Sequence, residues 1–219
     1  MELTTKQIQE IDNRLKNNGI KYWDIRIEML DHVVTDIENR IGKGEELEKA
    51  ITNSFISLGW NGSLKQLNRK GWQNTNDKFR REHLLEIKNL IFNIKNIVIF
   101  VISLLMYYFL SEDLTLNIFK KVSVLIFSLP IILVLYLYVK TWHKKYGKSV
   151  NLDYGFFYLS FSFMILPGIP DLFENQSELI QKIAWLIVLS IHFLSISSGY
   201  KVYIKALKKV ENMRKQLLS

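Results

Sequence analysis

Cysteine is absent from the 219 residues, which excludes disulfides, thiolate catalysis and cysteine-ligated metal sites. The N-terminal stretch lacks an apolar core, so we expect no cleavable signal peptide. Gly-rich phosphate loops, His-Glu-x-x-His and Gly-x-Ser-x-Gly are also missing, as is an Asp-rich motif for prenyl-diphosphate chemistry. Without such a constellation we predict neither an enzyme nor a bound cofactor.

The charge balance is basic, with 29 Lys and Arg against 21 Asp and Glu and a net charge of +8. Such a balance suits nucleic acid or anionic lipid. Lys and Arg cluster beside apolar runs, which favours lipid and argues against a nucleic-acid partner. The mean hydropathy of +0.06 hides a segregation, because apolar residues crowd into the part after Asn96.

The polar part predicts a soluble domain of three to four short helices, because apolar residues recur there at helical spacing and do not alternate as in a strand. Thr4 or Thr5 would cap the first helix, and Gly19 would end it. Residues 1–75 form this predicted cytoplasmic domain, and a basic juxtamembrane helix follows at 76–96. Further helices are expected at 22–41, 45–58, 64–69 and 78–92, with a loop at 71–76.

Apolar runs of roughly membrane-spanning length occupy 97–204. A buried soluble helix explains any single run, but four runs with charged separators favour a four-helix transmembrane bundle. Pro130 is expected to kink the second run, and Pro167 to end the third. The predicted fold is therefore all-α, with a basic cytoplasmic tail at 205–219. The expected spans cover about 97–110, 122–139, 152–169 and 183–204.

Lys and Arg lie mainly on one side of these spans. They precede the first run, fill the connection between the second and third, and follow the fourth, whereas the other two connections are acid-rich. The positive-inside rule then places both termini in the cytoplasm. Six lysines on that side are candidates to face an anionic lipid leaflet. They are Lys140, Lys144, Lys145, Lys205, Lys208 and Lys209.

The second predicted helix carries a weak candidate for a metal site. Glu28, His32 and Asp36 recur every four residues, and His with carboxylates can hold zinc or iron. They lie on the polar side of the helix and no second ligand helix is evident. A solvated acidic face is the simpler interpretation, and we predict no metal.

Arg26 lies near the middle of the apolar stripe of the same helix. An Arg there needs a carboxylate partner, for which Asp12 and Glu10 are candidates. Arg26, Asp24 and Asp31 are therefore assigned to a structural ion pair or to partner binding.

His192 lies near the midpoint of the fourth run, close to Ser195 and Ser198. An ionisable residue inside a membrane marks a functional site by default, but no acidic or basic group shares its depth. Either a neutral His bonded to another helix or a functional polar group fits this position, with the serines as small packing residues.

The N-terminal part resembles a known domain type. Tyr22–His32, Glu45–Ala50 and Leu58-Gly59 are similar to the HAAS-type helical domain, which is found in uncharacterised multi-span membrane proteins of Flavobacterium-type bacteria. The Pro that usually follows Leu-Gly is replaced by Trp60. The resemblance reaches about residue 60 and implies regulation or partner binding, without enzymatic activity.

Two functional hypotheses follow. The first is an integral inner-membrane protein with a regulatory, signalling or scaffold role, whose cytoplasmic domain binds a protein partner. The second is a small transporter or channel subunit, which needs a polar path through the bundle near His192, with Ser195, Ser160 and Ser162 converging on it.

Overall fold

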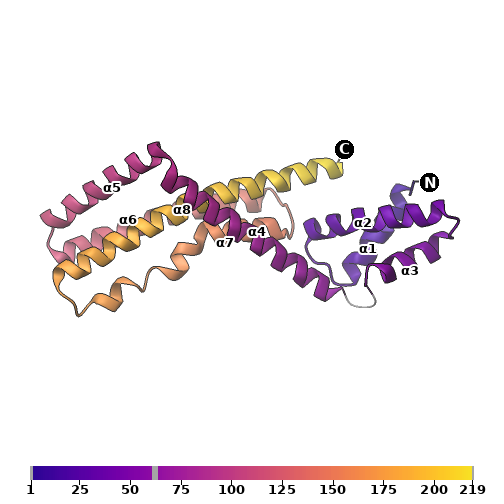
Figure 1. Ribbon diagram of the computed structural model, residues 1–219, viewed down its shortest axis with the longest axis horizontal. Coiled ribbons are helices and arrows are strands. Elements are labelled where there is room, and N and C mark those ends of the chain that lie inside the picture. Colours follow the sequence, from indigo (N-terminus) through magenta and orange to yellow (C-terminus); the bar gives the residue numbers. More distant parts are fainter. Residues whose placement is uncertain (1, 61–63, 219) are drawn as a thin grey trace. The chain divides into compact units, whose positions relative to one another are not determined.

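The computed structural model describes residues 2–60 and 64–218, with side chains up to residue 215. These residues form α-helices, one short 3-10 helix and no strand, which confirms the all-α class (Figure 1). The helices are α1 (Thr5–Asn17), α2 (Trp23–Gly42), α3 (Leu47–Ser57), α4 (Lys65–Phe92), α5 (Ile94–Asp113), α6 (Leu116–His143), α7 (Val150–Ile165), η1 (Pro170–Phe173) and α8 (Glu178–Leu218).

The described residues divide into two compact units. The head unit comprises Met1–Asn76, Tyr146–Asn151 and Met213–Ser219, and the bundle unit comprises Asp77–Lys145 and Leu152–Asn212. The connection between α6 and α7 and the end of α8 thus belong with the N-terminal helices. Hydropathy alone does not indicate this grouping.

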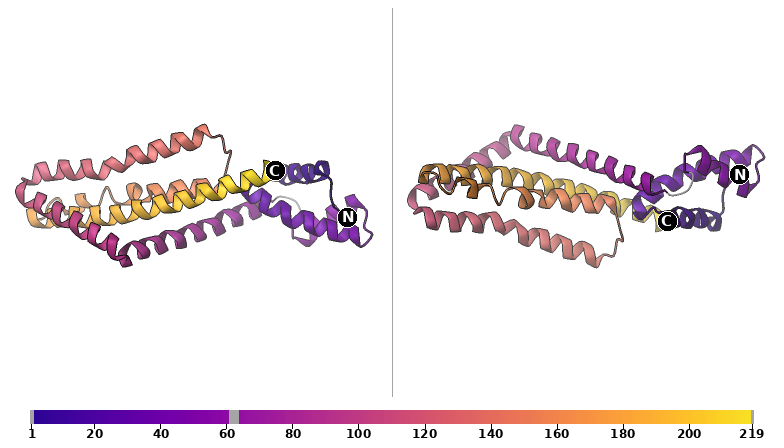
Figure 2. Two further views of the ribbon diagram at one scale, coloured as in Figure 1. Left: turned by 90° about the horizontal axis from the view of Figure 1, so that it is seen from above. Right: turned by 90° about the horizontal axis from the view of Figure 1, so that it is seen from below.

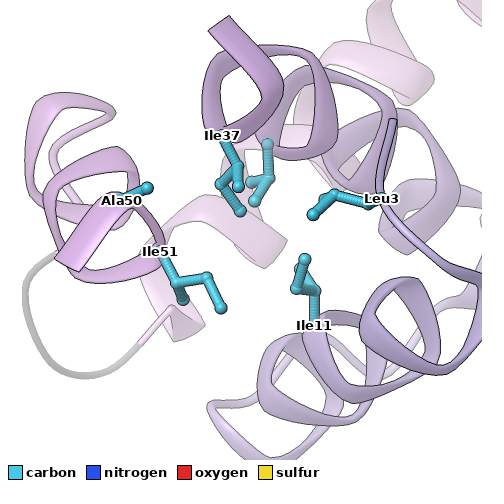
Figure 3. Packing of buried hydrophobic residues seen from close by; sticks show 6 residues of the cluster. Leu3, Ile11, Ile37, Ala50 and Ile51 are labelled. Atoms are coloured by element: carbon cyan, nitrogen blue, oxygen red, sulfur yellow. The ribbon is translucent and has the colours of Figure 1, made fainter. Parts of the chain in front are cut away.

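The head unit is built around an apolar core from α1, α2 and α3 (Figure 3). Thr4 and Gln7 form a reciprocal capping box that starts α1, as expected for a Thr cap. Ile11, Val33 and Ile37 are fully buried, so the apolar stripes predicted for the first two helices meet in this core. The remaining members of the cluster are Leu3, Ala50 and Ile51.

The predicted loop at 71–76 is wrong, because α4 runs unbroken from Lys65 to Phe92. Gly71 suggested a break, yet it serves close packing inside the head unit. A Cβ on Gly71 would lie 3.1 Å from Cδ1 of Ile25 and 3.2 Å from its Cγ2. Because Gly71 has no side chain, Ile25 of α2 packs directly on the backbone of α4. A glycine inside a helix costs about 1 kcal/mol in helix propensity relative to alanine.

Four helical segments of the bundle unit and its borders are long and apolar enough to cross a membrane. They begin earlier or end later than the apolar runs, because capping and interfacial residues extend each helix. Asn93, for example, starts α5 by accepting hydrogen bonds from the backbone N–H groups of Lys95 and Asn96. The segments are Ile94–Asp113, Leu116–His143, Val150–Phe173 and Glu178–Lys215.

The helices α7 and α8 run side by side (Figure 2), and glycines allow a close approach between them. A Cβ on Gly199 would overlap the backbone carbonyl of Tyr158 and lie 2.8 Å from Cα of Leu159, and a Cβ on Gly155 would lie 3.1 Å from Cβ of Ala206. Such contacts are typical of membrane helix pairs, where apolar burial supplies little net attraction. α6 completes this core through residues such as Phe127, which packs with α7 and α8.

Candidate functional site

Asp24, at the start of α2, is a buried carboxylate that accepts several hydrogen bonds within the head unit. It is 1% exposed. One carboxylate oxygen accepts hydrogen bonds from Ser149 Oγ at 2.7 Å, Asn151 N at 3.0 Å and Asn151 Nδ2 at 2.7 Å. The other accepts from Val150 N at 3.1 Å and from Ile25 N at 3.2 Å. The carboxylate therefore caps the N-terminus of α7.

Hydrogen-bond donors at the start of α7 stabilise the Asp24 carboxylate in place of a basic side chain. No basic side chain forms an ion pair with it among residues 2–60 and 64–215, so the predicted ion pair of Asp24 is not formed, while its predicted partner-binding role stays a prediction. Donors at a helix N-terminus carry partial positive charge, which favours a carboxylate. Trp23 N also donates to Lys148 O at 3.1 Å, so two adjacent residues of α2 hold the same connection.

Gly147 lets this connection turn back on α2. Its φ of +78° lies in the left-handed region that favours glycine. A Cβ at Gly147 would also lie 3.5 Å from Cδ1 of Trp23, in ordinary contact. The turn therefore places Ser149 and the first residues of α7 against Asp24.

Arg26 forms the expected structural ion pair with α1. Its Nε donates to Oδ1 of Asp12 at 2.5 Å, and both side chains are partly buried. Asp31 is exposed on α2. Of the two carboxylates expected to pair with Arg26, Asp12 and Glu10, Asp12 is therefore the partner.

Glu28 and His32 lie exposed on α2, while Asp36 is engaged elsewhere. Arg40 Nε donates to Asp36 at 2.8 Å, and this bond is the main cause that lowers the pKa of Asp36. Within the described ranges no group of three or more His, Asp or Glu residues could hold a metal ion. The surface is an acidic face rather than a ligand set.

In the bundle unit, His83 of α4 is buried against α7 and α8. Its Nδ1 lies 2.9 Å from Ser198 Oγ, and its ring packs on Tyr158 with centroids 5.2 Å apart. Burial lowers the pKa of His83. Ser198 Oγ is placed to donate to Ser195 O at 3.0 Å, so we assign the His83 Nδ1–H as the donor to Ser198.

Glu86, one turn further along α4, pairs with two lysines of α8. Lys205 Nζ lies 2.6 Å from Oε1 and Lys201 Nζ lies 3.3 Å from Oε2. The Lys205 bond, followed by Lys201, lowers the pKa of Glu86. The lysines thus hold α4 against α8 in the bundle unit.

Several lysines assigned to lipid have partners in the protein. Lys205 pairs with Glu86, and Lys144 pairs with Glu211 at 2.6 Å, so neither is committed to lipid alone. Lys140 lies over the Tyr136 ring, 5.8 Å from its centroid. Lys145 and Lys208 are exposed and Lys209 is half-buried.

His192 points into the bundle rather than toward its surface. It is 3% exposed and its ring lies between Phe127 and Phe163, with centroids 4.0 Å and 4.8 Å away. Neither ring nitrogen reaches hydrogen-bond geometry with any group of the described residues. The backbone of Phe127 on α6 still interacts with the imidazole outside that strict geometry, so the expected link to another helix is weak rather than absent. Ser195 is buried on the same helix, and its Oγ also has no partner among these residues.

A cavity of about 770 Å³ lies beside His192, between α5, α6 and α8. Its walls are mainly apolar. Tyr107, which bonds to Ser123, and a few serines supply the other polar groups. Of the residues that the structure describes, no Lys, Arg, Asp or Glu lines it. The lining includes Phe100, Ser103, Leu104, Met106, Leu129, Pro130, Leu189, Ser190, Phe193 and Ser197.

Sequence reasoning missed His83 and Glu86, although a signal was present. Phe79, His83, Glu86 and Leu90 recur at helical spacing on α4, and all four are buried. Read as one stripe, they predict a helix face that packs against other helices despite its two ionisable members.

Comparisons with protein-family models, with curated proteins and with solved structures found no match. The resemblance of the N-terminal part to HAAS-type domains stays a prediction.

Proposed function

We propose that this chain is a multi-pass protein of the bacterial inner membrane with both termini in the cytoplasm, and that its head unit is a regulatory or scaffold module that binds a protein partner. The observation that carries the proposal is the set of hydrogen bonds that Asp24 accepts from Ser149, Val150 and Asn151. Through them the N-terminal helices hold the connection that leads into the third span.

The composition of the head unit supports this topology. The N-terminal helices, the α6–α7 connection and the chain end after α8 belong to one compact unit. Segments that belong to one compact unit lie on the same side of a membrane. Two candidate spans separate the N-terminal helices from the α6–α7 connection, and two more separate that connection from the end of α8, so all three segments return to the same side. The basic residues favour the cytoplasmic side. Lys182, on the opposite side, pairs with Glu178 at 2.9 Å and weighs less against this orientation.

The Asp24 contact supplies a route for a signal. Hydrogen bonds to a charged group contribute about 1.5–3 kcal/mol each, and Asp24 is almost fully desolvated. A partner that displaces the start of α2 has to break these bonds or move residues 146–151 with it. Binding at the head unit is thereby coupled to the backbone at the start of α7.

Site-specific photocrosslinking of the full-length protein in its native membranes tests partner binding. A photoreactive residue at exposed His32 reports on the outer face of α2, and one at exposed Gln9 on α1 is the matched control. We expect a discrete adduct with a second protein from His32 and a weaker one from Gln9. If neither position captures a second protein, the partner-binding proposal fails.

The alternative, a small transporter or channel subunit, has less support. Ser160 donates to Phe156 O at 2.9 Å, so its hydroxyl serves its own helix. His192 lies between two phenylalanine rings, and the cavity beside it is mainly apolar. A polar path needs more hydrogen-bonding groups than this region supplies.

A further inference from the structure

We infer that the outer face of the second half of α4, residues 81–92, binds the surface of an anionic phospholipid leaflet, with its apolar side chains against the acyl chains and its basic side chains on the phosphate groups. The inference goes beyond the proposed function, because it concerns a lipid contact and no protein partner. Only the assignment to the cytoplasmic leaflet rests on the proposed topology.

Large apolar side chains point outward from α4, although this helix is too polar to be one of the four candidate spans. Leu84 is 58% exposed and Phe92 is 75% exposed, and Leu85 and Ile91 are exposed as well. They occupy the side of the helix opposite its buried residues, which are Phe79, His83, Glu86 and Leu90. In both views of Figure 2 this part of α4 lies at the outer edge of the bundle unit, so these side chains are open to the surroundings of the protein.

Basic side chains lie among these apolar residues. Arg81 and Lys88 are exposed on the same side of the helix, and Lys88 Nζ lies 6.0 Å from the centre of the Phe92 ring. Residues 78–95 carry five Lys or Arg against two Glu, and one of these, Glu86, is buried on the opposite side. Such a mixed surface is typical of helices at the membrane interface, where the stems of Lys and Arg lie along hydrocarbon and their charges reach phosphate groups.

The contact with α8 places α4 at the edge of the hydrocarbon. Lys182 and Lys201 are separated along α8 by about 28 Å at a rise of 1.5 Å per residue, which matches a hydrocarbon core of about 30 Å. Lys201 thus marks one boundary of that core, and its Nζ lies 3.3 Å from Oε2 of Glu86 on α4. The candidate span α5 begins at Ile94, directly after α4 ends. The outer face of α4 is therefore at the level of the lipid head groups.

A second copy of the chain fits this face less well than lipid does. In a symmetric pair the same patch of both copies would meet, so Arg81 and Lys88 of one copy would lie against those of the other. Like charges that face each other across an interface are unfavourable. Anionic phospholipids supply the opposite charge and apolar chains together.

Hydrogen exchange of the full-length protein in liposomes tests the inference, with phosphatidylcholine alone compared with an equal mixture of phosphatidylcholine and phosphatidylglycerol. Each basic side chain near an anionic surface strengthens the contact about fivefold. We expect the amides of residues 81–92 to exchange about fivefold to twentyfold more slowly in the mixture. Both leaflets contain the same lipids, so the result does not depend on the orientation of the chain and is separate from the test of the proposed function.

The double substitution Arg81→Gln and Lys88→Gln should remove most of this difference. Lys43→Gln and Lys49→Gln, at two exposed lysines of the head unit, change the net charge equally and should leave the difference intact. The inference is overturned if the α4 amides exchange equally in both kinds of liposome. It is also overturned if the Arg81 and Lys88 variant keeps the full difference.

A nitroxide on Leu84→Cys gives a second measurement, because natural cysteine is absent. We expect it to collide more often with oxygen than with a water-soluble nickel chelate, and a nitroxide on Asn74→Cys, at an exposed position earlier in α4, to show the reverse. If spin–spin broadening at position 84 disappears on dilution with unlabelled protein, a second copy covers the face and the inference is overturned.

Discussion

The head unit and the bundle unit are both helical, but they place their large apolar side chains differently. In the head unit, Ile11, Val33 and Ile37 are completely buried and the charged residues pair on the outside. In the bundle unit, large apolar side chains such as Ile132 are exposed, and helices meet through Gly155 and Gly199. The hydrophobic effect stabilises the core of the head unit, whereas close backbone packing and a few polar contacts hold the helices of the bundle unit together.

The largest contrast is expected from the same truncation in both units. Ile37→Ala removes a fully buried side chain from the head core, and we expect a loss of about 2–5 kcal/mol in the free energy of unfolding of that unit. Ile132, which is 69% exposed on α6, should tolerate Ala with little change. Hydrogen exchange of the α1–α3 amides in the full-length protein measures the first effect. Equal effects of both substitutions would contradict the comparison.

The Asp24 contact provides the next test. Asp24→Asn keeps the shape but replaces one acceptor oxygen with a donor, which removes the charged acceptor of the Ser149 and Asn151 donors. We expect a loss of about 2–4 kcal/mol, because these bonds involve a charged and buried group. Faster hydrogen exchange at Val150 N and Asn151 N reports it. Asp31→Asn, exposed on the same helix, is the control and should leave both amides protected.

The glycine contact tests the other kind of packing. Gly199→Ala forces α8 away from Tyr158 and Leu159, and overpacking of this kind costs about 1–3 kcal/mol. Gly168→Ala meets nothing within 4 Å and is the matched control. Thermal unfolding in detergent should separate the two variants. A Gly199→Ala protein as stable as the control would mean that α7 and α8 do not approach this closely.

A smaller, pH-dependent effect is expected where α4 packs on α8. The folded pKa of His83 is lowered by burial, so its contribution is present at neutral pH and is lost as pH falls below the unfolded value of about 6.5. The pKa of Glu86 is lowered by Lys205 and Lys201, so its contribution is lost only as pH falls below about 4.3.

Hydrogen exchange of α4 against pH should therefore show two steps. The lower step, which comes from the Glu86 ion pairs, should be no more than about 1 kcal/mol, because both lysines are partly exposed. His83→Asn removes the upper step and Glu86→Gln the lower one, while Glu2→Gln, exposed near the N-terminus, alters neither. A profile that keeps both steps in either variant would contradict the assignment.

Sequence patterns predict a structural feature correctly where residues close to it in the sequence determine that feature. The apolar runs locate the four described helical segments that are long and apolar enough to span a membrane, and Arg26 in an apolar stripe predicts a carboxylate on α1. They failed where the cause lies far along the chain. Gly71 is helical because Ile25 packs on it, and the partners of Asp24 lie about 125 residues away.

The polar residues of the membrane part show the same limit. The depth of Ser198 predicts a small packing residue, but its hydroxyl meets His83 on α4, which is not one of the four apolar segments. The depth of His192 allows either a bond to another helix or a functional polar group, and only the structure shows that its ring lies between Phe127 and Phe163. Hydropathy gives the depth of a residue and not the direction of its side chain.

The topology is the claim on which the proposed function depends, and the absence of natural cysteine makes it directly measurable. Lys148→Cys places a thiol in the exposed part of the α6–α7 connection, and Glu174→Cys places one between α7 and α8. In intact cells a membrane-impermeant maleimide should label Glu174→Cys and leave Lys148→Cys unlabelled until the membrane is opened. Labelling of Lys148→Cys in intact cells would contradict a cytoplasmic head unit.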